Sequence, residues 1–190
     1  GEQALTIHKR IYRQRTNADY ESKFSLDFNR EQGAVFIVDE ASMLSDSTGD
    51  GALFGSGSLL EDLVSYVRSG RGCRLILVGD SAQLPPVGCD FSPALDPATV
   101  SRYGEVVYGL MDEVVRQQMQ SGILFNATLV RCMLENRIYE IPKFEMDYPD
   151  FESVEGGDFM EKLQDAFDRY GRDEVIVITR SNKRANRYNE

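Results

Sequence analysis

The sequence predicts an α/β fold with a parallel sheet flanked by helices. Three apolar runs carry this prediction, VFIV at 35–38, LILV at 75–78 and VIVI at 175–178, and each is continuous rather than alternating. Short continuous runs are typical of strands that are covered on both faces, as in parallel sheets. The weaker run EVVYGL at 105–110 is a fourth candidate. Helical patterns separate the runs, and strand–helix–strand order favours an α/β architecture.

The first helix is predicted between the first two strands. Ser58 and Glu61 form a capping box at its start, and Gly70 is a natural stop at its end. An apolar stripe with helical spacing runs along it. The stripe consists of Leu59, Leu60, Leu63, Val64 and Val67.

Two more helices are predicted in the second half of the chain. One follows the same design as the first, with Asp158 and Glu161 at its start and Gly171 at its end. The other covers residues 123–136, ILFNATLVRCMLEN, where apolar residues recur at helical spacing.

The composition is that of a globular protein. Of the 190 residues, 42% are hydrophobic, and no apolar run approaches the ~18 residues that a membrane span requires. The amino terminus lacks the residue order of a signal peptide. Cys73, Cys89 and Cys132 are far apart and have no CxxC spacing, which favours reduced thiols. We therefore expect a soluble, cytoplasmic protein with no membrane partner.

Charge alone does not identify a partner. The formal net charge is −10, which argues against a nucleic-acid binder. The distribution is uneven, however, because residues 8–15 and 180–187 are basic while residues 144–173 are strongly acidic. Basic runs are usually solvated faces, so further evidence is needed before nucleic acid is inferred.

Polar side chains follow two of the predicted strands at the point where each strand ends. Asp39 and Glu40 follow the first run, and Asp80 and Gln83 follow the second. Ligands of open parallel sheets bind beyond the carboxyl ends of the strands. Carboxylates at adjacent strand ends are costly unless a metal or a polar ligand lies between them. ATP with Mg²⁺ supplies both.

These segments resemble a known family. VFIVDEASML followed by LILVGDSAQLPPVG is similar to motifs II and III of superfamily 1 helicases of the RecD/Dda-like branch, to which the exodeoxyribonuclease V alpha subunit belongs. TIHKRIY at 6–12 resembles motif Ia, and DEVVRQ at 112–117 resembles motif IV. VIVITRSNKRANRYN at 175–189 resembles the strand and basic turn early in the second domain of the family. Motifs II and III are specific as a pair, and the others are less so.

The resemblance implies a role for each candidate catalytic residue. Asp39 coordinates Mg²⁺ through water, and Glu40 is the general base for the attacking water. Gln83 senses the γ-phosphate, and Asp80 supports that switch. Arg116 is the arginine finger from the second domain. Two simpler interpretations remain open: Arg116 as a surface arginine and Asp80 as a cap at a strand end.

The resemblance also implies a track for single-stranded DNA. Thr6 and His8 in the motif Ia segment are expected near the nucleic acid, as are Asn182 and Arg184 in the carboxyl-terminal segment. His8, the only histidine, is equally compatible with a packing role. The basic runs coincide with these segments, which predicts modest DNA affinity for the chain itself.

Across the chain, the resemblance implies two domains. Residues 1–112 correspond to most of a RecA-like first domain of the P-loop NTPase class, and residues 113–190 to the truncated start of a second. The phosphate-binding motif GxxxxGK[ST] does not occur in the chain, and in the family it lies upstream of residues 6–12. The glycine-rich loop at 45–57 fits neither this motif nor GxGxxG, so it is expected to be a flexible connector. We expect an interior part of a larger enzyme, with little or no ATP hydrolysis of its own.

The function that the resemblance implies is that of a part of an ATP-dependent DNA helicase, which in the family moves on single-stranded DNA in the 5′ to 3′ direction. Nuclease or repair-complex subunits are possible partners, as in DNA repair and recombination. Two alternatives stay open: an RNA helicase or other superfamily 1 motor, because GDSAQLPPV also resembles the RNA-remodelling branch, and a non-catalytic partner-binding module that keeps the scaffold.

Overall fold

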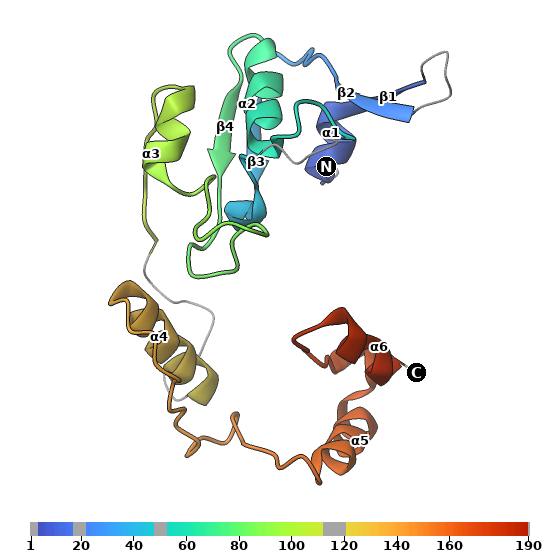
Figure 1. Ribbon diagram of the computed structural model, residues 1–190, viewed down its shortest axis with the longest axis vertical. Helices are drawn as coiled ribbons and strands as arrows, with labels where there is room; N and C mark the ends of the chain where they lie inside the picture. The colour runs from blue at the N-terminus through green and yellow to red at the C-terminus, as the bar shows by residue number, and fades with distance from the viewer. Residues whose placement is uncertain (1–3, 17–21, 48–52, 112–120, 190) are drawn as a thin grey trace. The chain divides into compact units, whose positions relative to one another are not determined.

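The computed structural model describes residues 4–16, 22–47, 53–111 and 121–189. The chain divides into two compact units, Gly1–Asp112 (unit 1) and Glu113–Glu190 (unit 2). Figure 1 shows that helices and strands are interspersed in unit 1. The elements of unit 1 are α1 (Ile7–Ile11), β1 (Tyr12–Thr16), β2 (Ser22–Leu26), β3 (Val35–Val38), η1 (Ala41–Met43), α2 (Leu59–Ser69), β4 (Arg74–Leu77), α3 (Pro97–Val100) and η2 (Ser101–Tyr103).

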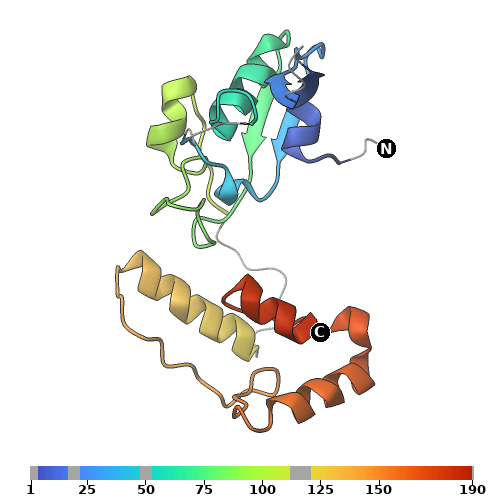
Figure 2. The ribbon, with the colours of Figure 1, turned by 45° about the vertical axis from the view of Figure 1, so that its right-hand side comes forward.

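Strands β3 and β4 form the predicted parallel pair. The register runs from Val35 opposite Arg74 to Val38 opposite Leu77. In both Figures 1 and 2 the two arrows point toward the same edge, where η1 and the loop after β4 lie. The α/β class and the first two predicted strands are therefore confirmed.

Helix α2 connects the two strands and packs on one face of the pair. The Ser58 hydroxyl accepts a hydrogen bond from the Glu61 amide at 3.3 Å, and Gly70 follows the last turn, as predicted. The ring of Tyr66 meets Phe36 of β3 edge-on, with 5.9 Å between the ring centroids. The predicted apolar stripe forms the centre of the core, in which Leu60 is fully buried.

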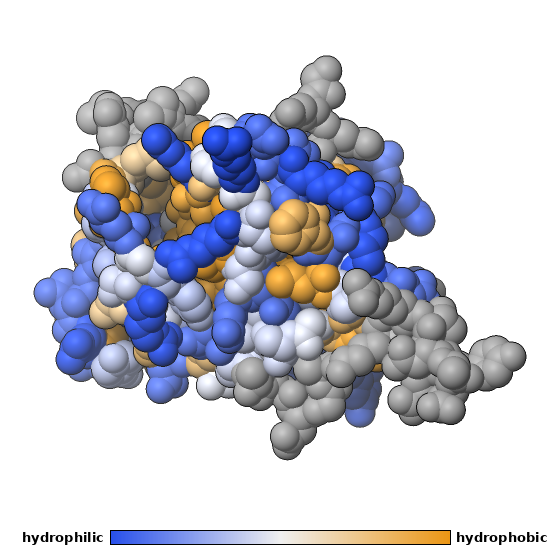
Figure 3. Space-filling view, turned by 90° about the horizontal axis from the view of Figure 1, so that it is seen from above, coloured by the Kyte–Doolittle hydropathy of each residue, from blue (hydrophilic) through white to orange (hydrophobic). Residues whose placement is uncertain are grey.

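The opposite face of β3 and β4 remains open to solvent. Val35 is 52% exposed, Ile37 68% and Ile76 46%. Figure 3 shows hydrophobic residues at the surface among hydrophilic ones. The expectation that both faces are covered is thus wrong for the described residues. The reason is geometric, because alternate side chains of a strand point to opposite faces and α2 covers one of them.

A β-hairpin precedes the parallel pair and does not follow from the apolar runs. Strands β1 and β2 pair antiparallel, with Tyr12 opposite Leu26. Part of the glycine-rich loop pairs with β2 through two backbone hydrogen bonds. The Phe24 amide donates to the Leu53 carbonyl (3.1 Å), and the Gly55 amide donates to the Phe24 carbonyl (2.8 Å). The Phe24 and Phe54 rings stack 4.5 Å apart. Residues 53–57 are therefore built into the fold and are not a flexible connector.

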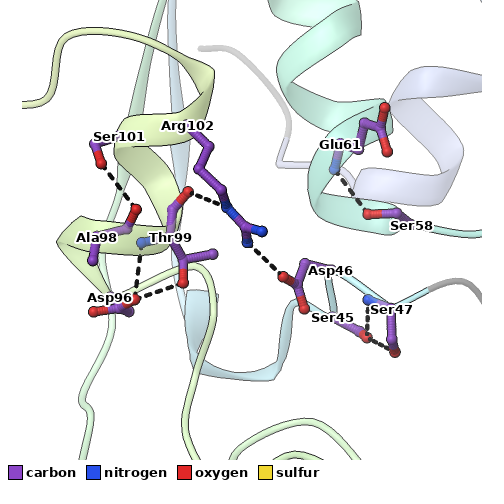
Figure 4. A network of polar contacts seen from close by, with 10 residues as sticks. All are labelled: Ser45, Asp46, Ser47, Ser58, Glu61, Asp96, Ala98, Thr99, Ser101 and Arg102. Atoms are coloured by element: carbon purple, nitrogen blue, oxygen red, sulfur yellow. Dashed lines mark hydrogen bonds and ion pairs between the residues drawn. The ribbon is translucent and has the colours of Figure 1, made fainter.

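A polar network anchors α3 and η2. Figure 4 shows Asp96 as the cap of α3, accepting hydrogen bonds from the amide and the hydroxyl of Thr99. The Arg102 guanidinium donates to the Thr99 carbonyl (3.1 Å) and forms an ion pair with Asp46 (2.9 Å). The hydrogen bonds from Thr99 lower the pKa of the Asp96 carboxyl. This network ties the end of unit 1 to the segment that follows η1.

Unit 2 contains the two predicted helices and one more. Its elements are α4 (Gly122–Glu135), α5 (Phe159–Tyr170), η3 (Arg172–Glu174) and α6 (Asn182–Asn189). Gly171 ends α5 with a φ of 86°, a conformation that favours glycine. Asp158 precedes α5 but makes no capping hydrogen bond through its side chain, so the predicted copy of the Ser58–Glu61 cap is wrong there.

Two of the predicted strands do not form. Residues 175–178 and 105–110 have no strand assignment, and Ile176 and Ile178 are 83% and 87% exposed. A strand needs a neighbour to receive its backbone hydrogen bonds. Within the described residues, neither run is paired with another strand. The predicted strand early in the second domain is therefore corrected to an unpaired segment.

Candidate nucleotide site at the strand ends

Strands β3 and β4 end at one edge of the sheet, and acidic residues follow both. The parallel register pairs Val38 with Leu77. The ladder continues past them, because the Val78 amide donates to the Val38 carbonyl at 2.8 Å. Residues 39–40 therefore leave the sheet beside residues 79–80. The structure brings the two acidic segments to the edge where ligands of parallel sheets bind.

Glu40 opens a tight turn after β3. Its backbone lies in the left-handed region, with φ 54° and ψ 40°, a conformation that costs a side-chain-bearing residue on the order of 1 kcal/mol. The Glu40 amide donates to Asp39 Oδ1 at 3.0 Å, and the Ala41 amide donates to the Val78 carbonyl at 2.9 Å. Asp39 and Glu40 both remain exposed. Exposed carboxylates on a strained backbone favour ligand contact over a role in the core.

Asp80 and Gln83 belong to one turn after β4. Asp80 Oδ1 accepts from the Ala82 amide at 2.9 Å, and the Asp80 carbonyl accepts from the Gln83 amide at 3.1 Å. This is the pattern of an Asx turn. Asp80 is half-buried and Gln83 is exposed. Asp80 therefore shapes the turn, consistent with the simpler interpretation as a cap, while Gln83 is the more accessible of the two.

The donors at this edge are compatible with a magnesium ion held mainly by water. Within the parts of the chain that the structure describes, no three His, Cys, Asp or Glu residues form a metal-binding group. Mg²⁺ keeps several of its waters and binds proteins through one or two carboxylates plus substrate phosphates. The exposed carboxylate of Asp39, directly after β3, fits that requirement.

Thr6 and His8 have local contacts in and around α1. Thr6 is the N-cap of the helix, and its Oγ1 accepts from the Lys9 amide at 3.3 Å. The His8 ring lies 4.9 Å from the Phe54 ring and 5.6 Å from the Tyr12 ring, between centroids. His8 is nevertheless exposed. The structure thus gives His8 a packing role and leaves it open to solvent.

The remaining predicted site residues fall in or near unit 2. Asn182 is the first residue of α6 and is exposed, as is Arg184. The Arg184 amide donates to the Ser181 carbonyl at 3.0 Å. Arg116 lies outside the described residues.

The buried pair of Tyr12 and Asp62 could not be predicted from the sequence patterns. The Tyr12 hydroxyl donates to Asp62 Oδ2 at 2.7 Å, and the Ser56 amide donates to the same oxygen at 3.0 Å. Burial and this hydrogen bond raise the pKa of Tyr12 above its usual range. The pair joins β1 to α2. The sequence contained one indication that Asp62 is buried: it lies three residues after Leu59 and four before Tyr66, on the apolar side of the helix.

One family comparison is positive. Residues 1–89 match the family model described as an AAA domain. No curated protein and no solved structure matches the chain. The match covers fewer than half of the 190 residues and includes both acidic strand ends. This part of the chain is therefore similar to nucleotide-dependent ATPases.

Two further observations bear on the expected environment of the protein. Cys73, Cys89 and Cys132 are free thiols. Among the described helices, none combines the length and the hydrophobicity needed to cross a bilayer.

Proposed function

We propose that the chain is part of an ATP-dependent DNA helicase of the RecD/Dda-like branch of superfamily 1. In this proposal, hydrolysis of ATP with Mg²⁺ drives movement along single-stranded DNA, from 5′ to 3′, and separates the duplex. The AAA-domain match over residues 1–89 supports the nucleotide-dependent part. The motif resemblances described above support the branch, the polarity and the DNA substrate.

The observation that carries the proposal is the parallel pairing of β3 with β4. This pairing directs two acidic segments, one after each strand, to one edge. Two acidic segments at one edge are unfavourable by themselves, because neighbouring carboxylates repel one another unless a cation lies nearby. A magnesium-bound triphosphate is a ligand with the matching charge and hydrogen-bonding groups.

Each residue at this edge has a chemical role in the proposal. Glu40 accepts the proton of the water that attacks the γ-phosphate. Gln83 contacts the γ-phosphate, and Asp80 holds the turn that carries Gln83. Asp39 would hold a hydrated Mg²⁺, which would supply positive charge to the bound triphosphate. Arg116, which lies outside the described residues, is assigned by the motif resemblance alone as the arginine that stabilises the charge developing on the phosphoryl group during transfer.

The first test removes the base and keeps its shape. Glu40→Gln in the full-length protein that contains these residues is expected to lower the ATP turnover number by about 10²- to 10⁴-fold, because the amide cannot take the proton. Nucleotide binding, measured with a fluorescent ATP analogue and Mg²⁺, is expected to persist. Glu105→Gln, at an exposed position in the same unit, serves as the matched control and is expected to retain wild-type turnover.

The same assay separates the competing functions. Stimulation of ATP hydrolysis by single-stranded DNA and not by single-stranded RNA supports the DNA helicase, and the reverse preference supports the RNA-remodelling alternative. A GxxxxGK[ST] motif upstream of residue 1 in the full-length protein would support the motor, and its absence there would support the non-catalytic module, which is the second candidate. Absence of any nucleic-acid-stimulated hydrolysis in the wild-type full-length protein would establish that candidate instead.

A further inference from the structure

Gly79, which follows β4, lies against the backbone of the turn that follows β3. A Cβ atom added to Gly79 would lie 3.1 Å from the Ser42 amide nitrogen and 3.2 Å from the Ala41 amide nitrogen. It would also lie 3.0 Å from Leu95 Cδ1. These separations are shorter than ordinary van der Waals contacts. The backbone of Gly79 lies outside the left-handed region, so the position requires glycine for space and not for φ.

The turn that packs on Gly79 is the one that carries Glu40. Ala41 and Ser42, the two residues after Glu40, are fully buried. The Ala41 amide is held by the Val78 carbonyl at 2.9 Å. The Ser42 hydroxyl has no hydrogen-bond partner among the described residues. Backbone packing against Gly79, together with that amide bond, therefore fixes the turn, and the side-chain hydroxyl does not.

We propose that Gly79 is a positioning residue for Glu40. This inference rests on the proposed function, because it assigns the catalytic use of Glu40 to a fixed place at the site. The bare backbone of Gly79 lets the turn at 40–42 close against the end of β4, and that contact sets where the Glu40 carboxylate lies. A methyl group at position 79 pushes two backbone amides of the turn by a few tenths of an ångström.

The consequence is a selective loss of the chemical step. Displacement of a catalytic group by about 1 Å can cost about 10²-fold in rate, so a smaller displacement of Glu40 is expected to cost about tenfold. Nucleotide binding depends on other groups, and it is expected to remain within about twofold of the wild-type value. The split between kcat and KM distinguishes a positioning role from a general loss of structure.

The test is Gly79→Ala in the full-length protein, compared with Gly109→Ala. Gly109 lies in the same unit, has no atoms within 4 Å of an added Cβ and has an unrestricted backbone conformation. We expect Gly79→Ala to lower kcat for DNA-stimulated ATP hydrolysis about tenfold, with KM for ATP and the melting temperature close to wild type. Gly109→Ala is expected to match the wild type in all three.

A second variant identifies which contact matters. Leu95→Ala removes the flexible side chain nearest to the added methyl and leaves the two amides in place. If the turn is what moves, the Gly79→Ala/Leu95→Ala double variant stays as slow as Gly79→Ala, relative to Leu95→Ala alone. Recovery of the rate in the double variant would assign the effect to crowding of Leu95 and would overturn the inference.

Three other outcomes overturn the inference: unchanged kcat in Gly79→Ala, a parallel loss of kcat and nucleotide binding, or failure of the variant to fold. The last two would show that the contact at Gly79 stabilises the fold and does not specifically position Glu40. Failure of the proposed function looks different. In that case the wild-type protein shows no stimulated hydrolysis, or Glu40→Gln retains full turnover, before any change at Gly79 is considered.

Discussion

The interactions within unit 1 differ from those within unit 2. Among the described residues of unit 1, eleven hydrophobic residues between Ile11 and Ala94 are buried in one core. In unit 2, the buried residues of α4 are Gly122 and Asn126, and among the described residues no large hydrophobic side chain of this unit reaches the same burial. Long apolar side chains such as Ile141, which is 92% exposed, remain at its surface. The buried Asn126 side chain of unit 2 is instead held by hydrogen bonds to the backbone.

In this chain, the apolar runs predicted as strands join a core where backbone pairing gives them a shared face. In unit 1, pairing of β3 with β4 places Phe36, Val38, Leu75 and Leu77 against α2 or its neighbours. In unit 2, the equally apolar run at 175–178 has no strand beside it in the described parts of the chain. Its alternate side chains, Ile176 and Ile178, are exposed to solvent.

The contrast between the two units would be refuted most directly if the same substitution had the same effect on stability in both. Leu60→Ala in α2 removes a fully buried side chain and is expected to cost about 2–5 kcal/mol of unfolding free energy. Leu134→Ala in α4, where the residue is 47% exposed, is the matched control and is expected to cost less than about 1 kcal/mol. Hydrogen exchange followed by mass spectrometry reads α2 and α4 separately. Equal losses of protection would refute the contrast.

A smaller effect is expected from the buried amide of unit 2. The Asn126 side chain donates to the carbonyls of Gly122 (2.9 Å) and Glu145 (2.8 Å) and accepts from the Glu145 amide (2.8 Å). Asn126→Ala removes hydrogen bonds to buried or partly buried backbone groups of Gly122 and Glu145 and is expected to cost about 1–3 kcal/mol. Asn136→Ala, at the exposed end of α4, is the control and is expected to have little effect. Protection of α4 that survives Asn126→Ala would mean that apolar packing, not this amide, holds the unit.

The smallest effect depends on pH. The Ser121 hydroxyl (2.6 Å) and the Gly122 amide (2.7 Å) donate to the Asp150 carboxylate, and these bonds lower its pKa from the ordinary 3.8. A lowered folded-state pKa adds stability above the ordinary value, and this stability is lost as the pH falls through the folded-state pKa. Asp150→Asn is therefore expected to melt below the wild type near neutral pH and together with it in strong acid.

Thermal unfolding of unit 2 over a pH series measures this effect. The neighbouring exposed carboxylate Asp147 provides the control, and Asp147→Asn is expected to follow the wild type throughout. A difference between Asp150→Asn and the wild type that persists unchanged into acid would show that the carboxylate charge is not what stabilises the contact.

Much of the candidate site could be predicted from local sequence, and the reason is the geometry of parallel strands. Two apolar runs ending in Asp39–Glu40 and Gly79–Asp80 meet at one edge whenever they pair in parallel, because their carboxyl ends then coincide. The left-handed backbone of Glu40 and the contact between Gly79 and the Ala41–Ser42 amides are different. They depend on atoms about 40 residues apart in sequence, and no periodicity records them.

By itself, the sequence determined the elements whose signals are local: the helix begun by Ser58 and ended by Gly70, the helices near 123–136 and 158–171, and the two strands of the parallel pair. The tertiary structure decided which apolar runs become strands, which face of the sheet is covered and that residues 53–57 join β2. Caps and helical stripes act within a few residues of the chain. Strand pairing and burial require partners brought from far along it, so a run such as 175–178 has the composition of a strand and still does not form one.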